Sequence, residues 1–187
     1  MDEVLQRMLG KLSIVNKGIN GNRLLSGPPM AALGLYGSAG MERFERDVLG
    51  EAGASAVIIE MGTNDIGMSH NPQKPGWITA GKLEKAFEEV VQRCHDRKIK
   101  VYGSTILPRG GSPGYLKEAE AERRDFNEWM RGSSLFDGVL DFDVLLRDSS
   151  CPEILSFPYD SGDHLHPHPL GGRQMAALVA ERILSSM

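Results

Sequence analysis

The chain alternates between continuous apolar runs, which are typical of buried strands, and apolar residues spaced three or four apart, which are typical of helices. The strongest strand signal covers residues 55–61, where the apolar run is nearly unbroken, as in parallel sheets that are buried on both faces. Further strands are predicted at residues 12–15, 99–106 and 138–142.

Helices are predicted between these strands. The clearest apolar stripe belongs to a helix that buries Leu83, Ala86, Phe87, Val90, Val91 and Cys94. Other helices are predicted at residues 2–10, from Ser38 as an N-cap to just before Gly50, at residues 114–131, and in a last segment that buries Met175, Leu178, Val179 and Ile183. Because strands and helices alternate along the whole chain, the sequence predicts one α/β domain, residues 1–187, with a parallel sheet between helices.

Composition and charge narrow the functional classes. The net charge is -4 and the basic residues are scattered, so we expect no nucleic acid and no membrane surface as a partner. No apolar stretch approaches the roughly 20 residues that a membrane span needs. Cys94 and Cys151 define no disulfide framework, and Cys94 is predicted to be a buried free thiol because it lies on an apolar stripe. The sequence assigns no cellular compartment.

Asp163 and His166 lie three residues apart in the polar loop before the last predicted helix. A carboxylate at this spacing can reach Nδ1 of the imidazole, fix its tautomer and stabilise its charged form, which leaves Nε2 available as a general base. Aspartate and histidine are also common in polar surface loops, so the pair alone is a weak signal, and a surface loop without a catalytic role is the more common case.

A second group of candidates follows the strongest strand, at the carboxyl edge of the sheet where the sites of such folds gather. Gly62 lets the backbone turn sharply, and the amide of Asn64 could donate a hydrogen bond to a developing oxyanion. Alternatively, Asn64 and Asp65 only cap the next segment. Gly21, in a glycine-rich turn, could present its N–H to the same cleft or could only supply a positive φ.

His164, His166 and His168 alternate, so an extended backbone would place the three rings on one side, which suggests a metal site. Apart from Asp163, however, no cysteine or carboxylate cluster completes such a ligand set, and two prolines restrict the loop. We therefore predict that the site holds no metal ion and needs no cofactor.

Together these motifs resemble those of the SGNH (GDSL-type) hydrolases, a superfamily of esterases and lipases with a three-layer, flavodoxin-like α/β/α fold. The resemblance covers essentially the whole chain: Asn16–Arg23 resembles the second block of the family, Gly62–Asp65 the third, and Asp163–His166 the fifth. It implies that Asp163 and His166 are the acid and base of a catalytic triad and that Gly21 and Asn64 are oxyanion donors.

Two further stretches, Tyr102–Thr105 and Tyr159–Pro167, look like a branch of the superfamily that acts on carbohydrate esters. The expected activity is therefore hydrolysis of small acyl esters, acetyl esters in particular, with a small-molecule ester as the substrate. The alternative is a catalytically impaired or non-catalytic protein that keeps only the cleft.

The nucleophile is the one element of the family pattern that the sequence does not supply. In the family it is the serine of a G-D-S block at the end of the first strand, and this chain begins after the position of that block. None of its serines resembles the family nucleophile. Ser26, in the loop after Gly21, and Ser38, at the start of a predicted helix, are the substitute candidates.

The resemblance also implies that a central strand is missing, between the strands predicted at 12–15 and 55–61 in the flavodoxin-like order 2-1-3-4-5. Two inner edges would then carry backbone N–H and C=O groups without partners. We expect one of three repairs: the two strands close on each other, a second chain supplies a strand, or a homo-oligomer buries the edge. Strand addition is the most natural, because an open edge templates another strand.

Overall fold

The computed structural model describes residues 6–7, 10, 12–27, 35–68, 72–73 and 76–185. The chain forms two compact units. The sheet unit consists of Lys17–Ile106 and Leu116–Val139, and the terminal unit consists of Met1–Asn16, Leu107–Tyr115 and Leu140–Met187.

The sheet has three strands in the order β1-β2-β3. β1 spans Ala56–Ile59, β2 spans Lys100–Ser104 and β3 spans Gly138–Leu140. β1 and β2 run parallel, with Ala56 opposite Lys100 and Ile59 opposite Gly103. The predicted α/β class with a parallel sheet is confirmed, and a sheet of three strands fits a missing first strand.

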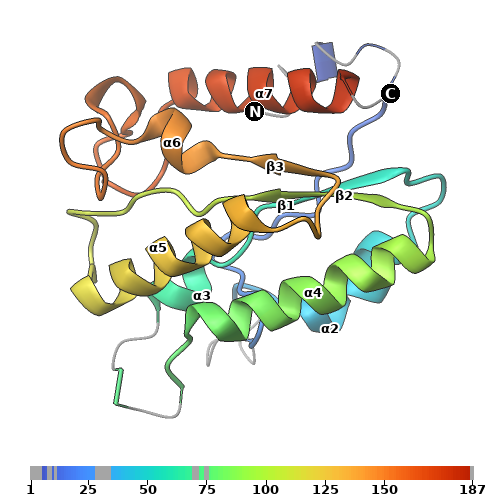
Figure 1. Ribbon diagram of the computed structural model, residues 1–187, viewed down its shortest axis with the longest axis horizontal. Helices are drawn as coiled ribbons and strands as arrows, with labels where there is room; N and C mark the ends of the chain where they lie inside the picture. Colours follow the sequence, from blue (N-terminus) through green and yellow to red (C-terminus); the bar gives the residue numbers. More distant parts are fainter. Residues whose placement is uncertain are drawn as a thin grey trace. The chain divides into compact units, whose positions relative to one another are not determined.

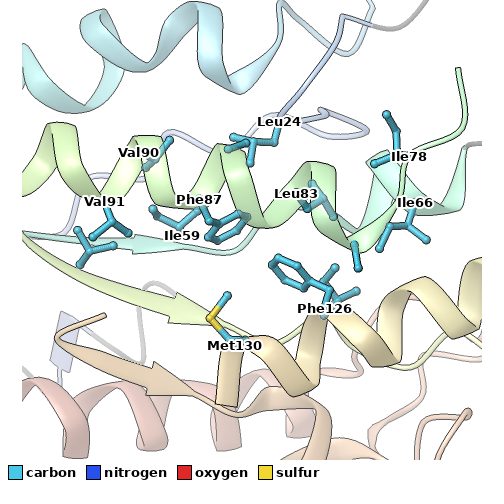
Figure 2. Close-up of a cluster of buried hydrophobic side chains, with 14 of the residues drawn as sticks. Leu24, Ile59, Ile66, Ile78, Leu83, Phe87, Val90, Val91, Phe126 and Met130 are labelled. Atoms are coloured by element: carbon cyan, nitrogen blue, oxygen red, sulfur yellow. The ribbon is translucent and has the colours of Figure 1, made fainter. Parts of the chain in front are cut away.

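The helices of the sheet unit are α2 (Gly40–Phe44), which continues into the π-helical turn η2 (Glu45–Leu49), α3 (Thr63–Gly67), α4 (Ala80–Asp96) and α5 (Lys117–Gly132). α4 and α5 lie side by side on one face of the strands (Figure 1). All six positions of the stripe predicted for α4 are buried. Figure 2 shows Ile59 of β1, Phe87 of α4 and Phe126 of α5 in one cluster, where the two phenyl rings pack edge to face at 5.1 Å.

A carboxylate from α5 caps the beginning of α4. Glu122 accepts hydrogen bonds from the backbone N–H of Ala80 (2.7 Å) and from the indole N–H of Trp77 (3.2 Å). The first N–H groups of a helix have no partner within the helix, so this contact satisfies one of them and fixes the two helices to each other.

The terminal unit contains α6 (Phe142–Leu146), the 3-10 turn η3 (Phe157–Tyr159) and α7 (Pro169–Leu184), which packs against both. α6 was not predicted from the sequence. The strand expected at 138–142 ends at Leu140 because Asp141 caps α6, accepting a hydrogen bond from the N–H of Val144 at 3.2 Å. No helix within the described ranges is long and apolar enough to cross a membrane.

The strand predicted at residues 12–15 is wrong: this segment has no strand structure. Its backbone groups bond to the Gln6 side chain instead, which donates to the oxygen of Leu12 (2.5 Å) and accepts from the N–H of Ile14 (3.1 Å). A strand is stable only beside a partner strand, and without one a side chain can satisfy the same groups.

Two other expectations concern helix ends. Ser38 is not an N-cap: Ala39 precedes α2 and no side chain caps that helix. Its first N–H groups, those of Gly40 and Met41, donate instead to the backbone oxygens of Arg23 (2.8 Å) and Leu24 (3.0 Å). The helix predicted at residues 2–10 lies outside the described residues except at positions 6, 7 and 10, of which 6 and 7 are helical.

Candidate active site

Two backbone hydrogen bonds close the loop that carries Asp163 and His166. The N–H of Ser161 donates to the oxygen of His166 (3.1 Å), and the N–H of His168 donates to the oxygen of Tyr159 (2.7 Å). The two candidate residues therefore lie on a constrained loop directly before α7, and their backbone positions are fixed relative to each other.

The carboxylate of Asp163 holds the imidazole of His166, as the spacing predicts. Oδ2 lies 2.6 Å from Nδ1, and Oδ1 accepts hydrogen bonds from the N–H of His166 (2.8 Å), the N–H of Leu165 (3.0 Å) and the hydroxyl of Ser161 (2.9 Å). These bonds, those from His166 foremost, hold the pKa of the Asp163 carboxyl well below its usual range. An ionised carboxylate on Nδ1 favours the tautomer in which Nε2 accepts a proton, and 64% of the His166 side chain is exposed.

The same loop contains a second Asp–His pair that the sequence reasoning missed. Nδ1 of His164 lies 2.5 Å from Oδ2 of Asp160, whose Oδ1 accepts from the N–H of Gly162 (2.8 Å) and of His164 (3.1 Å). Burial raises the pKa of Asp160, but these hydrogen bonds outweigh it, so the pKa lies below its usual value. His164 has a φ of +59°, which side-chain-bearing residues rarely adopt. The four-residue spacing of Asp160 and His164 is the feature of the sequence from which this second pair could have been predicted.

The three alternating histidines do not share a ligand. Nδ1 of His164 and of His166 each faces its own aspartate, whereas Nδ1 of His168 accepts from the N–H of Leu170 at 3.3 Å and caps α7. Over the ranges that the structure describes, no cluster of three histidine, cysteine or acidic side chains could hold a metal ion.

In the sheet unit, the turn after β1 places two polar side chains on a distant segment. Gly62 precedes α3 with a φ of +111°, a conformation that favours glycine. The fully buried Asp65 accepts hydrogen bonds from the N–H groups of Leu24 (2.8 Å) and Leu25 (2.9 Å), and Asn64 donates to the oxygen of Asn22 (3.1 Å). Both side chains thus reach a segment about 40 residues away in sequence, and the role of Asn64 as an oxyanion donor stays a prediction.

Gly21 lies one residue before the backbone group that Asn64 holds. Its φ is +69°, and a Cβ at this position would collide with the ring of Tyr36. Asn22 donates its side-chain amide to the oxygens of Tyr36 and Ser38, both at 2.7 Å, which fixes the covering loop. The structure thus brings the two candidate oxyanion donors, Gly21 and Asn64, into one hydrogen-bonded neighbourhood.

Both substitute nucleophiles, Ser26 and Ser38, are exposed and belong to the sheet unit. In the loop of His166 itself, the hydroxyl of Ser161 donates to Asp163 and not to the imidazole. Gly21 and Asn64 belong to the sheet unit, whereas Asp163 and His166 belong to the terminal unit. That the imidazole opens toward Asn64 stays a prediction.

Fold and motifs define the class of protein, and comparison with known families agrees. The chain belongs to the GDSL-like lipase/acylhydrolase family, whose sequence profile matches residues 1–174. The resemblance that the motifs suggested is therefore confirmed. No curated protein sequence matches the chain.

Solved structures of this class share the fold at low sequence identity. A protein described as a lipolytic protein of the G-D-S-L family from Desulfitobacterium hafniense is 19% identical, with a TM-score of 0.67 over 97% of this chain and 86% of the other. The acetyl xylan esterase AlAXEase is 21% identical, with a TM-score of 0.64 over 100% and 89%. The acetylxylan esterase Axe2 from Geobacillus stearothermophilus is 19% identical, with a TM-score of 0.58 over 98% and 77%.

Proposed function

We propose that this protein is a carboxylic-ester hydrolase for small acyl esters, acetyl esters on carbohydrates in particular. The observation that carries the proposal is the Asp163–His166 pair, in which an ionised carboxylate 2.6 Å from Nδ1 leaves Nε2 as a proton acceptor. Membership of an acylhydrolase family and the acetyl xylan esterases among proteins of similar fold support the choice of substrate.

In the proposed reaction His166 acts as general base and then as general acid. Its Nε2 takes the proton of the attacking hydroxyl while the hydroxyl oxygen bonds to the ester carbonyl carbon, and Asp163 stabilises the imidazolium. The imidazolium then returns the proton to the alcohol oxygen as the ester bond breaks. A water molecule, deprotonated by Nε2 in the same way, then attacks the acyl group, and the proton returns to the hydroxyl oxygen as the carboxylic acid leaves. The Gly21 N–H and the Asn64 side chain donate to the oxyanion; the Asn64 amide has two N–H groups, and the bond to Asn22 uses one.

The second candidate function is a binding domain that retains the cleft without turnover. It is favoured by one observation, that the serine in the loop of the pair, Ser161, donates its hydroxyl to Asp163 rather than to His166. The two functions differ in whether an acyl group is released, and hydrolysis of an activated ester therefore separates them.

The test is the hydrolysis of p-nitrophenyl acetate by the wild type and by His166→Ala. We expect turnover far below that of a family member with the full triad, because loss of a triad member leaves roughly 10³–10⁴-fold catalysis over water. His166→Ala should remove most of this turnover, whereas the matched variants His164→Ala and His168→Ala should change it little. Equal losses at all three histidines would support the metal hypothesis instead.

The identity of the nucleophile is tested with an active-serine reagent. Fast turnover that the reagent abolishes would contradict the low activity expected here, and the labelled serine would then be mapped, with Ser26→Ala and Ser38→Ala as the first variants. Turnover that is absent in both the wild type and His166→Ala would contradict the hydrolase proposal and leave the binding domain as the second candidate.

A further inference from the structure

β1 is an outer strand that is bonded along one edge. Its neighbour in the sheet is β2, and within the described ranges no strand pairs with its other edge. Its burial fits an incompletely covered position: Ile59 is buried, Val57 and Ile58 are half-buried, and Ala56 is exposed. A strand with four apolar residues in a row is typical of the interior of a parallel sheet, where both faces are covered.

The register identifies which backbone groups face the open edge. The N–H of Lys100 donates to the oxygen of Ser55 (3.0 Å), and Ala56 lies opposite Lys100. In a parallel ladder the peptide groups of alternate residues point to the same side. Those of Val57 therefore point to β2, and those of Ala56 and Ile58 point away from it.

This open edge lacks the features that protect exposed strands. Edge strands of monomeric proteins carry lysine, proline or a bulge, which block pairing with a second chain. Between Ala54 and Ile59 there is no charged residue and no proline, and the flanking charges are Glu51 and Glu60.

We propose that the β1 edge pairs with β1 of a second copy of this chain, antiparallel, around a two-fold axis at Val57. In this register Ala56 lies opposite Ile58 of the partner subunit, and each such pair exchanges both N–H···O bonds. The outward-facing peptide groups of β1 are then satisfied by the same groups of its copy. The edge is self-complementary, as a two-fold interface requires.

Side chains and charges fit this register. Val57 faces Val57 of the partner subunit as a non-hydrogen-bonded pair, the arrangement in which side chains approach most closely and two β-branched residues pack well. Glu60 lies opposite Ala54 of the partner subunit, so no like charges face each other. This absence of repulsion favours a second copy as the occupant.

The experiment measures mass by light scattering over a concentration series. We expect the wild type to have twice the mass of one chain, and Val57→Lys and Val57→Glu each to be monomeric, because like charges would face each other across the axis. Mixing the two variants should restore the dimer, since lysine then faces glutamate. Val139→Lys is the matched control: it changes a half-buried valine of β3, a strand at the other side of β2, and should stay dimeric.

A second variant guards against loss of folding. Ala56→Pro removes a donor on the open edge, at the first residue of the strand, where proline is tolerated and the ladder to β2 is untouched. It should weaken the dimer at least tenfold with an unchanged circular dichroism spectrum. A monomeric wild type would overturn the proposal. Amide hydrogen exchange at Ile58 would then show whether the edge is open to solvent or is covered by another segment of the same chain, and both results contradict the dimer. The proposal would also be overturned by a mixture of the two charged variants that stays monomeric while Val139→Lys is dimeric, because the pairing of lysine with glutamate across the axis would then restore nothing.

Discussion

Asn64 donates its side-chain amide to the backbone oxygen of Asn22 at 3.1 Å, across 42 residues of sequence. Asn22 in turn donates its own amide to the oxygens of Tyr36 and Ser38, both at 2.7 Å. One hydrogen-bonded frame therefore connects the turn after β1 with two loops. Gly21, directly before Asn22, is held in the same frame as the Asn64 side chain, the second proposed oxyanion donor.

This frame predicts that Asn22→Ala destabilises the protein strongly. Asn22 is 4% exposed, and its side-chain oxygen Oδ1 accepts two hydrogen bonds, at 3.2 and 2.9 Å, from the buried guanidinium of Arg43. The substitution leaves several buried polar groups without partners, each costing about 1–3 kcal/mol. We expect urea denaturation to give a free energy of unfolding lower by about 2–4 kcal/mol.

Asn20→Ala is the matched control for this prediction, because Asn20 is exposed and lies two residues away. Its free energy of unfolding should stay within about 0.5 kcal/mol of the wild type. Similar values for the two variants would mean that the Asn22 frame contributes nothing to stability.

A pair of glycine substitutions separates backbone strain from helix propensity. At Gly62, where φ is +111°, a Cβ would lie 2.8 Å from the Ile106 side chain and 3.2 Å from that of Leu83. Gly62→Ala should therefore lower the free energy of unfolding by about 1–3 kcal/mol, which a thermal melt detects as a lower melting temperature. At Gly81, in the first turn of α4, a Cβ meets no atom within 4 Å, and Gly81→Ala should stabilise the protein, by less than the roughly 1 kcal/mol of a helix interior. A melting temperature that falls equally in both variants would contradict this reasoning.

The parts of the structure that were predictable from sequence depend on short-range pattern. All six stripe positions of α4 are buried, because a 3.6-residue period identifies one face of a helix without knowledge of its neighbours. The contact between Asp163 and His166 is likewise local, since a carboxylate and an imidazole three residues apart can meet within a single loop. Asp160 and His164 were within reach of the same reasoning.

What could not be predicted depends on distant partners. The segment at residues 12–15 has the composition of a strand, but its structure depends on whether a neighbouring strand exists, and Gln6 takes its hydrogen bonds. Asp65 contacts residues 40 and 41 positions away, so its spacing to nearby residues carried no information about its role. Ser38 has a side chain that suits a cap, but the first N–H groups of α2 donate to the oxygens of Arg23 and Leu24, which are about 17 residues away in sequence.

The two cysteines should differ sharply in reactivity. Cys94 is fully buried on α4, and burial raises the pKa of its thiol to about 11, so little thiolate forms at neutral pH. Cys151 is only half-buried. Treatment of the native protein with iodoacetamide, followed by mass spectrometry, should modify Cys151 and leave Cys94 unmodified until denaturant is added. Equal rates in the native state would show that α4 opens readily or packs differently.

The last prediction concerns the pH dependence of stability through Asp65. Burial raises the pKa of this carboxyl, and the hydrogen bonds from Leu24 and Leu25 oppose that effect without cancelling it. The folded protein then binds the proton more tightly than the unfolded chain, whose aspartate pKa is about 3.9. The contribution of Asp65 to stability is therefore greatest below that pH and falls as the pH rises toward the raised folded value.

Asp65→Asn is the reference variant, because its amide does not titrate and all other groups are unchanged. Urea denaturation at a series of pH values from about 3.5 to 8 gives the free energy of unfolding of both proteins. The difference, wild type minus variant, should decrease with rising pH and become constant once Asp65 is ionised in the folded state. A difference that increases with pH would mean that the two N–H donors outweigh burial. Asp65 would then hold residues 24 and 25 as a favourable buried carboxylate, and its pKa would lie below 3.9 rather than above it.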